Sequence, residues 1–284
     1  MDPVTVASLA MLGSALCHAF MGLYTKASED TLVFRAVMML VGGIALLPVL
    51  LTHDIPGWEV WRFLLVAAGL HWAFQMAMIS AFNQADMGLV YPVMRGAAPA
   101  MAAGFALLFL GEVLSWGQTA GLAIAVAAVI GFGWSAKGGL PAAKPLGFAL
   151  LAASMTALYS VNDAAGARAA ENPLVYLAWL YWMIALPVGL TALVRRGRRL
   201  PTLARAALRP AIIAALFGMG TYSLAIYAFS LAPVGPMAAL RETSVVFGAG
   251  LAAWVLKEPF GRRRILLAIC LAAGLVFMQV SPGV

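Results

Sequence analysis

The chain has 284 residues, of which 63% are hydrophobic and only 10% are charged, whereas about a quarter of the residues in an ordinary soluble domain are charged. This composition excludes a soluble globular protein and indicates an integral membrane protein. The formal net charge of +7 does not indicate a nucleic-acid partner, because the basic residues gather at alternate ends of apolar segments, as they do in membrane proteins.

Ten apolar segments of about 20 residues follow one another along the chain, each long enough to cross a hydrocarbon core about 30 Å thick. They are continuously apolar, which favours helices, because the strands of a membrane barrel would alternate at every second residue. The expected fold is therefore an all-α integral membrane protein with ten transmembrane helices. The predicted spans are 4–25, 32–52, 60–82, 88–110, 117–136, 146–167, 173–194, 209–230, 235–256 and 264–281.

The distribution of Lys and Arg predicts how the chain is inserted. The first span is expected to be a retained helix, because no basic region precedes it. Of the 18 basic residues, 14 fall on one side of the predicted bundle. The positive-inside rule makes that side cytoplasmic and puts both termini outside, in what we expect to be a bacterial inner membrane. Anionic lipid headgroups are the expected partners of one basic cluster on that side, namely Arg195, Arg196, Arg198 and Arg199.

The two halves of the chain repeat one another. Arg95 aligns with Arg241 and Glu112 aligns with Glu258, both at an offset of 146 residues. We therefore expect one five-helix repeat over residues 1–140 and a second over residues 141–284. An odd number of helices inverts the second repeat, an architecture of secondary transporters in which the substrate site lies near the midplane between the repeats.

These features resemble a known family. Gly111-Glu112 and Lys257-Glu258 follow the fourth and ninth spans, and Arg35 opens the second span in "LVFRAVMML". With the five-plus-five repeat, they make the sequence similar to the drug/metabolite transporter (DMT) superfamily, and to its EamA-like ten-helix branch, over nearly the whole chain. The resemblance implies export or exchange of small metabolites between the two halves. Many bacterial members are thought to keep both termini in the cytoplasm, and the basic residues here predict the opposite.

Arg95 and Arg241 are the principal candidates for substrate binding. Each lies six or seven residues inside its span, about 10 Å from the nearer end at 1.5 Å per residue, which is too deep for easy contact with the interface. A guanidinium suits a carboxylate or a phosphate. The alternative is a structural ion pair, of Arg241 with Asp163 or of either arginine with Glu242.

Glu242, Asp163 and His18 are candidates for coupling or gating, because buried carboxylates and histidines can exchange protons. The alternatives are a permanent salt bridge for Glu242, an exposed helix end for Asp163, and a neutral hydrogen-bonded histidine at a helix interface for His18. Pro92 and Pro99 flank Arg95 and favour a bend that either moves or is only structural.

Aromatic and polar side chains within the spans supply candidate walls for a cavity. The alternative for the polar ones is hydrogen bonding across helices, and for the tryptophans it is an interfacial belt. These further substrate-binding candidates are His71, Trp72, Gln75, Tyr159, Asn162, Trp179 and Tyr222.

The favoured function is a secondary-active transporter, an exporter or exchanger, of a small polar or amphiphilic metabolite that resembles an amino acid or an organic anion. The sequence has no phosphate-binding loop, so an ion or solute gradient would supply the energy. No catalytic residue, metal site or cofactor is predicted, and the oligomeric state stays open. The alternatives are an intramembrane hydrolase or acyltransferase built on His18 or His71, and a passive facilitator or channel.

Overall fold

The computed structural model describes residues 2–26, 28–84, 87–133, 143–247 and 262–281, and within them every regular element is a helix. The helices are α1 (Pro3–Lys26), α2 (Thr31–Ala45), α3 (Leu47–Thr52), α4 (Trp58–Phe82), α5 (Met87–Leu110), α6 (Trp116–Gly133), α7 (Ala143–Ala169), α8 (Pro173–Arg196), η1 (Gly197–Arg199), α9 (Leu200–Leu231), α10 (Val234–Arg241) and α12 (Arg262–Val280).

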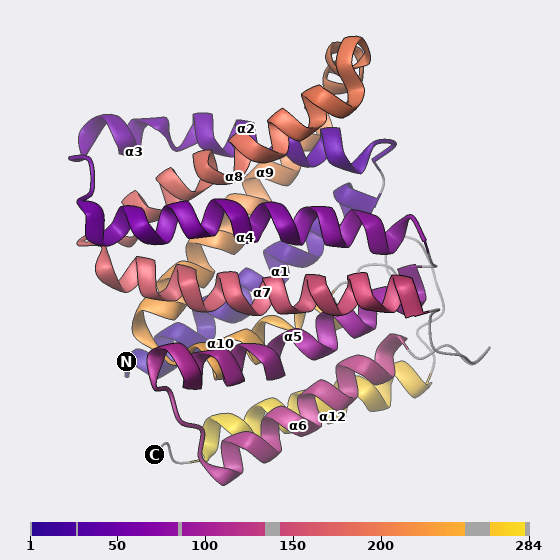
Figure 1. The fold of residues 1–284 in the computed structure, drawn as a ribbon. Helices are drawn as coiled ribbons and strands as arrows, with labels where there is room; N and C mark the ends of the chain where they lie inside the picture. Colours follow the sequence, from indigo (N-terminus) through magenta and orange to yellow (C-terminus); the bar gives the residue numbers. More distant parts are fainter. Residues whose placement is uncertain (1, 27, 85–86, 134–142, 248–261, 282–284) are drawn as a thin grey trace.

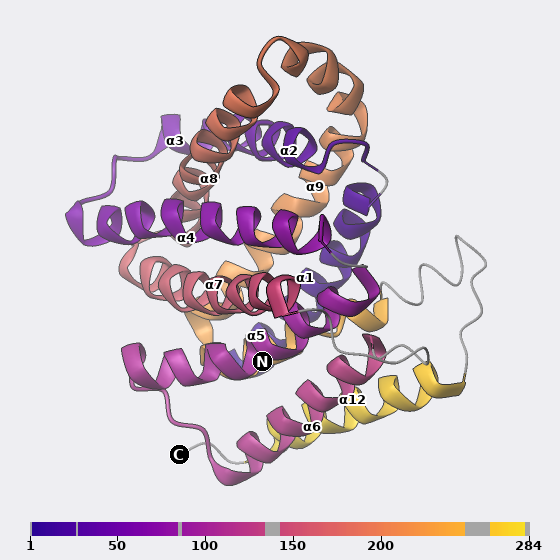
Figure 2. The same cartoon turned by 45° about the vertical axis from the view of Figure 1, so that its right-hand side comes forward.

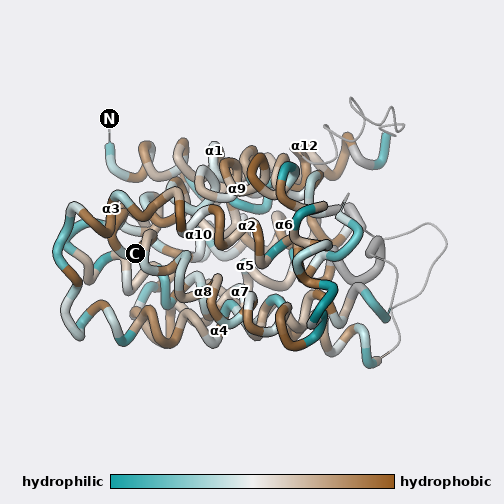
Figure 3. Tube along the Cα trace, turned by 90° about the horizontal axis from the view of Figure 1, so that it is seen from above, coloured by the Kyte–Doolittle hydropathy of each residue, from teal (hydrophilic) through white to brown (hydrophobic). Residues whose placement is uncertain are grey.

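The described chain is that of a multi-pass membrane protein. Six of its helical stretches are long and apolar enough to cross a membrane, and the last of them runs through α8, η1 and α9. Large apolar side chains such as Leu108 and Trp116 are exposed on the outside of the bundle, where lipid would cover them. Hydrophilic positions gather toward the ends of the helices (Figure 3). The predicted count of ten crossings stays a prediction, because residues 248–261 lie outside the described ones.

The helices pack in reciprocal pairs. α1 packs along α9 and α4 packs along α7, whereas α2 contacts α8 and α6 contacts α12 (Figures 1 and 2). α1 begins and α12 ends at the same face of the bundle, and the turn between α8 and α9 projects at the opposite end. Segments from both halves of the chain therefore meet in every one of these pairs.

The predicted span 32–52 is divided into α2 and α3 at Leu46. Pro48 has no N–H to continue the hydrogen bonds of α2, but it fits the first turn of a new helix. At the other end of α2, Asp30 accepts a hydrogen bond from the Val33 N–H and caps the helix. Burial raises the pKa of the Asp30 carboxyl, but hydrogen bonds from Arg196 and Val33 together lower it below its usual value. The hydrogen bond between Arg196 and Asp30 thus joins the start of α2 to the end of α8.

The basic segment between the predicted spans 173–194 and 209–230 is helical, which the sequence analysis did not predict. The turn is confined to η1, where Gly197 has a φ of +49°, a conformation that glycine adopts without strain. α9 then starts at Leu200, with Pro201 in its first turn, and continues through the good helix formers of "LARAAL".

The predicted continuous helix 235–256 is wrong at residues 242–243, where α10 ends inside the protein. The Thr243 N–H and hydroxyl both donate to the Leu240 carbonyl, which satisfies a backbone group at the helix end. A broken helix in a membrane protein is tolerated where it is buried in protein or lines a cavity. Arg241 and Glu242 are both buried at this break.

Candidate functional site: a cationic cavity between the helices

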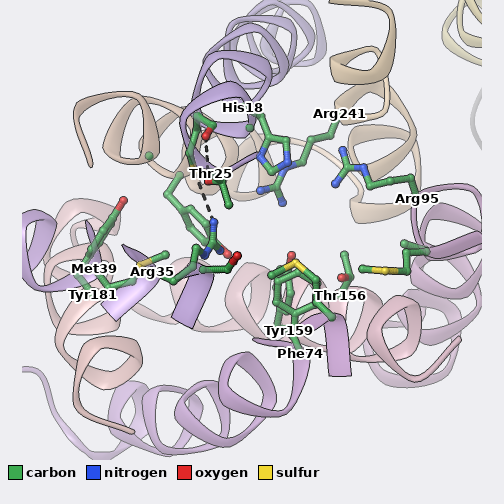
Figure 4. Close-up of a pocket in the computed structure, with 18 residues that line it drawn as sticks. His18, Thr25, Arg35, Met39, Phe74, Arg95, Thr156, Tyr159, Tyr181 and Arg241 are labelled. Atoms are coloured by element: carbon green, nitrogen blue, oxygen red, sulfur yellow. Dashed lines mark hydrogen bonds between the residues drawn. The ribbon is translucent and has the colours of Figure 1, made fainter. Parts of the chain in front are cut away.

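A cavity of about 240 Å³ lies where helices from both halves of the chain meet. Arg35 reaches it from one side, and Arg95, Arg241 and His18 converge on the other (Figure 4). The described residues that line it are His18, Met21, Gly22, Thr25, Thr31, Arg35, Met39, Phe74, Met78, Met94, Arg95, Ala98, Thr156, Tyr159, Tyr181, Gly218, Tyr222 and Arg241. These residues come from α1, α2, α4, α5, α7, α8, α9 and α10.

Two of the arginines are buried with incomplete hydrogen bonding. Arg35 on α2 and Arg241 at the end of α10 are 8% and 5% exposed. Within the described residues, the Nε of each has no hydrogen-bond partner. Arg241 lies over the Tyr222 ring, with its Cζ 5.5 Å from the ring centroid, a favourable cation–π distance. A buried charge is costly unless it is paired, so both side chains are suited to hold an anion.

The third arginine, Arg95, joins the two halves of the chain. Its Nε lies 2.9 Å from Glu242 Oε2, and its NH2 group donates to the Ser244 hydroxyl at 2.7 Å. The sequence left open whether Arg95 forms an ion pair with Glu242, and the structure contains this ion pair. The pair fixes α5 to the segment that follows the α10 break.

The cavity has an excess of positive charge. Three arginines line it, and among the described carboxylates the one paired with any of them is Glu242. Within the part of the chain that the structure describes, three positive charges and one negative charge leave an excess of two. Each cation at about 4 Å from a bound anion contributes about 4 kcal/mol at the effective dielectric constant typical of partly exposed sites. The site therefore favours anions over cations.

Four aromatic side chains form part of the remaining wall, together with methionines and threonines. Phe74, Tyr159 and Tyr181 line the cavity from α4, α7 and α8 (Figure 4), and Tyr222 lines it from α9. Tyr181 and Tyr222 meet edge to face, with ring centroids 6.3 Å apart. Aromatic faces of this kind can pack against the apolar body of a ligand. The combination suits a small amphiphilic anion.

A second polar cluster lies behind this aromatic wall. His71 on α4 and Asp163 on α7 are buried, and His71 Nε2 is 2.9 Å from Asp163 Oδ2. Asp163 Oδ1 accepts hydrogen bonds from the Tyr176 hydroxyl at 2.9 Å and from Asn162 Nδ2 at 3.4 Å. The interpretation of Asp163 as an exposed helix end is wrong, because residues of α8 and α4 cover it.

The two ends of the cavity differ. At one end its lining reaches Gly22, which is exposed, and Thr25 and Thr31, which are partly exposed, where α1 ends and α2 begins. At the other end Ala98 and Arg241 are buried. The cavity therefore approaches the surface at the face where α1 ends.

The opposite face is tied together by Arg168 and Glu112. Arg168 NH1 donates to Glu112 Oε1 at 2.8 Å, and its other nitrogens donate to the Phe229 and Ala232 carbonyls at the end of α9. Glu112 Oε2 accepts from the Val234 N–H at the start of α10 at 2.6 Å. One ion pair thus joins the ends of α7 and α9, the α5–α6 turn and the start of α10.

Comparison with known proteins identifies the family of this chain. The model of the EamA-like transporter family matches the chain twice, over residues 5–134 and 144–280. The chain belongs to the EamA-like transporter family. Among the solved structures that match, one titled only "Crystal structure of protein" superposes with a TM-score of 0.75 over 96% of this chain and 98% of its own, at 17% identity; this likeness shows the fold alone. No curated protein matches the sequence.

In this EamA-like transporter, some of the candidates predicted from sequence share the cavity. Arg95, Arg241, Tyr159, Tyr222 and His18 line it. Glu242 contacts Arg95 and, with Pro99, lines a smaller pocket beside it. Pro92 lies in α5, but its side chain is outside the described ones.

The other candidates lie elsewhere. Trp72 is 40% exposed and its indole N–H donates to Thr191 of α8, outside the cavity. Trp179 packs against Trp61 with ring centroids 4.9 Å apart. Gln75 is buried and is not among the residues that line the cavity. His71, Asn162 and Asp163 form the second cluster instead.

Arg35 was not predicted as a site residue, because it was counted among the 14 basic residues of the cytoplasmic side. A signal was present, since Arg35 is flanked by apolar residues on both sides in "LVFRAVMML". Phe74 was also missed as a cavity residue. Nothing in a single sequence separates it from the other aromatic residues of the spans.

Proposed function

We propose that this EamA-like transporter is a secondary-active exporter or exchanger of a small organic anion, such as a carboxylate or an amino-acid-like molecule, with an apolar or aromatic body. The convergence of Arg35, Arg95 and Arg241 on one aromatic-walled cavity carries the proposal. A carboxylate bound there would offset the excess positive charge and supply acceptors to Arg35 Nε and Arg241 Nε, which have no hydrogen-bond partner among the described residues. Trp72 and Trp179 are not part of this proposed site.

The proposed mechanism is alternating access between two inverted repeats, residues 1–140 and 141–284. The reciprocal pairing of α1 with α9 and of α4 with α7 supports it, as does the twofold match of the family model. The break of α10 at the cavity supports it further, since discontinuous helices are common at the binding sites of such transporters. In this proposal, the Arg168–Glu112 pair closes one face while the cavity is reached from the other.

The test is thermal unfolding of the detergent-purified protein with a matched series of phenyl compounds: benzoate and benzenesulfonate as anions, phenylalanine as a zwitterion, phenethylamine as a cation and benzenesulfonamide as a neutral analogue. A ligand at about 100 times its Kd stabilises the folded state by about 2.7 kcal/mol. We expect stabilisation by the anions and not by phenethylamine. Labelled anion should then exchange into proteoliposomes loaded with the unlabelled anion.

Arg241→Gln separates a binding role from a structural one. We expect the variant to lose the stabilisation by anions but to keep the thermal stability of the ligand-free protein, because it removes a buried charge whose Nε has no hydrogen-bond partner among the described residues. Arg205→Gln makes the same charge change at an exposed position of α9 and serves as the control. Anion stabilisation that survives in both Arg241→Gln and Arg35→Gln would contradict the proposal, as would stabilisation by phenethylamine alone.

A further inference from the structure

We infer that the buried pair of His71 and Asp163 takes up a proton when the anion binds, so that the transporter moves the anion together with a proton. This inference rests on the proposed anion site. It concerns a cluster that does not line the cavity. It specifies that the coupling ion is a proton and that the proton and the anion cross in the same direction.

The geometry of the pair allows two protonation states without movement of heavy atoms. A carboxylate only accepts hydrogen bonds, so His71 Nε2 carries a proton and donates it to Asp163 Oδ2 at 2.9 Å. His71 Nδ1 faces the Tyr222 hydroxyl at 3.4 Å. A neutral ring accepts from that hydroxyl, whereas a protonated ring donates to it, because a hydroxyl can serve as donor or acceptor. The proton is thus taken up at Nδ1.

Neutral and protonated states of the pair differ in net charge. With neutral His71 the pair carries the single negative charge of Asp163, and with protonated His71 it carries none. Asp163 stays stabilised in both states by the hydrogen bonds from Tyr176 and Asn162.

One layer of side chains separates the pair from the proposed anion site. The His71 ring stacks on Tyr159, with centroids 4.1 Å apart and planes at 19°, and Tyr159 lines the cavity. On another side His71 contacts Tyr222, whose ring lies under the Arg241 guanidinium. Among the described residues, the charged and titratable groups that face the pair are therefore Tyr176 of α8, Tyr159 of α7, Tyr222 of α9 and, across Tyr222, Arg241 of α10.

The sign of the coupling follows from the charges. A bound anion offsets the positive charge of Arg35 and Arg241, so that adding a positive charge at His71 costs less than it does in the empty cavity. By linkage, a protonated pair strengthens anion binding to the same extent. Anion affinity should therefore rise as the pH falls, until the pair is protonated whether or not the anion is bound. A monovalent anion and its proton would then cross the membrane together without net charge.

Benzenesulfonate is the probe for this inference, because it stays ionised and cannot carry the proton itself. The full-length protein in detergent is held in weak buffer near pH 7 with an indicator dye, and proton uptake is recorded as benzenesulfonate is added. Binding is measured separately by thermal unfolding. We expect uptake approaching one proton per bound ligand and none with benzenesulfonamide.

Variants locate the proton. His71→Gln should bind benzenesulfonate with little dependence on pH and take up no proton. Asp163→Asn gives a second route to the same loss if His71→Gln does not fold. His53→Gln, at an exposed histidine after α3, should behave like the wild type.

Each outcome decides between the two proposals. Binding without proton uptake by the wild type overturns the coupling and leaves the anion site standing. Uptake that persists in both His71→Gln and Asp163→Asn places the proton elsewhere and overturns the assignment. Absence of benzenesulfonate binding overturns the anion site, and the coupling falls with it.

Discussion

At the scale of single residues, close contacts around Asp163 determine what can be substituted. Gly166 lies one turn after Asp163 on α7, and a Cβ at this position would overlap the ring carbons of Tyr176. Tyr176 is fully buried and donates its hydroxyl to Asp163. The absence of a side chain at Gly166 therefore positions one hydrogen-bond donor of the buried cluster.

Gly166→Ala should destabilise the protein by about 1–3 kcal/mol, the usual cost of overpacking a tight core. Thermal unfolding measures the loss. The matched control is Gly147→Ala on the same helix, where no atom of the described residues lies within 4 Å of the new methyl group. The gain in helix propensity is expected to leave the stability of this variant unchanged or slightly raised. Equal stability of the two variants would contradict the contact described here.

At the scale of the helices, the ends of four segments depend on the ion pair between Arg168 and Glu112. Arg168 satisfies two carbonyls at the end of α9, and Glu112 satisfies the N–H of Val234 at the start of α10. Backbone groups at helix ends lack partners within the helix, so such side chains supply them. The Glu112 side chain is 14% exposed and that of Arg168 is 33% exposed. The pair is therefore partly buried and is expected to contribute more to stability than a fully exposed ion pair.

Arg168→Gln should lower stability by about 2 kcal/mol, because it leaves Glu112 and two carbonyls short of a charged donor. Thermal unfolding in detergent is the measurement, with Arg205→Gln as the control for charge alone. In proteoliposomes, a cysteine substituted for Ala98 reports access to the cavity. With Arg168→Gln, we expect this cysteine to react with a membrane-impermeant thiol reagent added on either side of the membrane. Unchanged stability of Arg168→Gln would show that the ion pair contributes no more to the free energy of unfolding than an exposed ion pair does.

At the scale of the whole molecule, the face at which the cavity approaches the surface is the one where α1 ends and where α8 turns into α9. This face carries the basic cluster Arg195, Arg196, Arg198 and Arg199. If the positive-inside rule governs insertion, the cavity faces the cytoplasm in this conformation and both termini lie outside.

A pair of reporters fused to the C-terminus tests this orientation. We expect a reporter that works only outside the cytoplasm to be active and one that works only in the cytoplasm to be silent. Neutralising the four arginines of the basic cluster together should weaken this bias, because basic residues in short loops set the orientation. Activity of the cytoplasmic reporter in the wild type would reverse the assignment.

Much of the architecture could be predicted because hydropathy is a local property. At 1.5 Å per residue, each long apolar run already specifies a helix that spans a bilayer. Arg95 and Arg241 were recognisable because a charge within such a run is rare and needs a polar environment. Helix ends were predicted less well, since the break at Glu242 and the early start of α9 depend on hydrogen bonds and turns that hydropathy does not register.

The sequence by itself determined the class of protein, the family resemblance and two of the three arginines in the cavity. The tertiary structure decided that Arg35 joins them, that His71 meets Asp163 from a helix 92 residues away, and that Trp72 faces outward to Thr191. The physical reason is that nearly every face of these helices is apolar. Which face turns inward therefore depends on close packing against neighbouring helices.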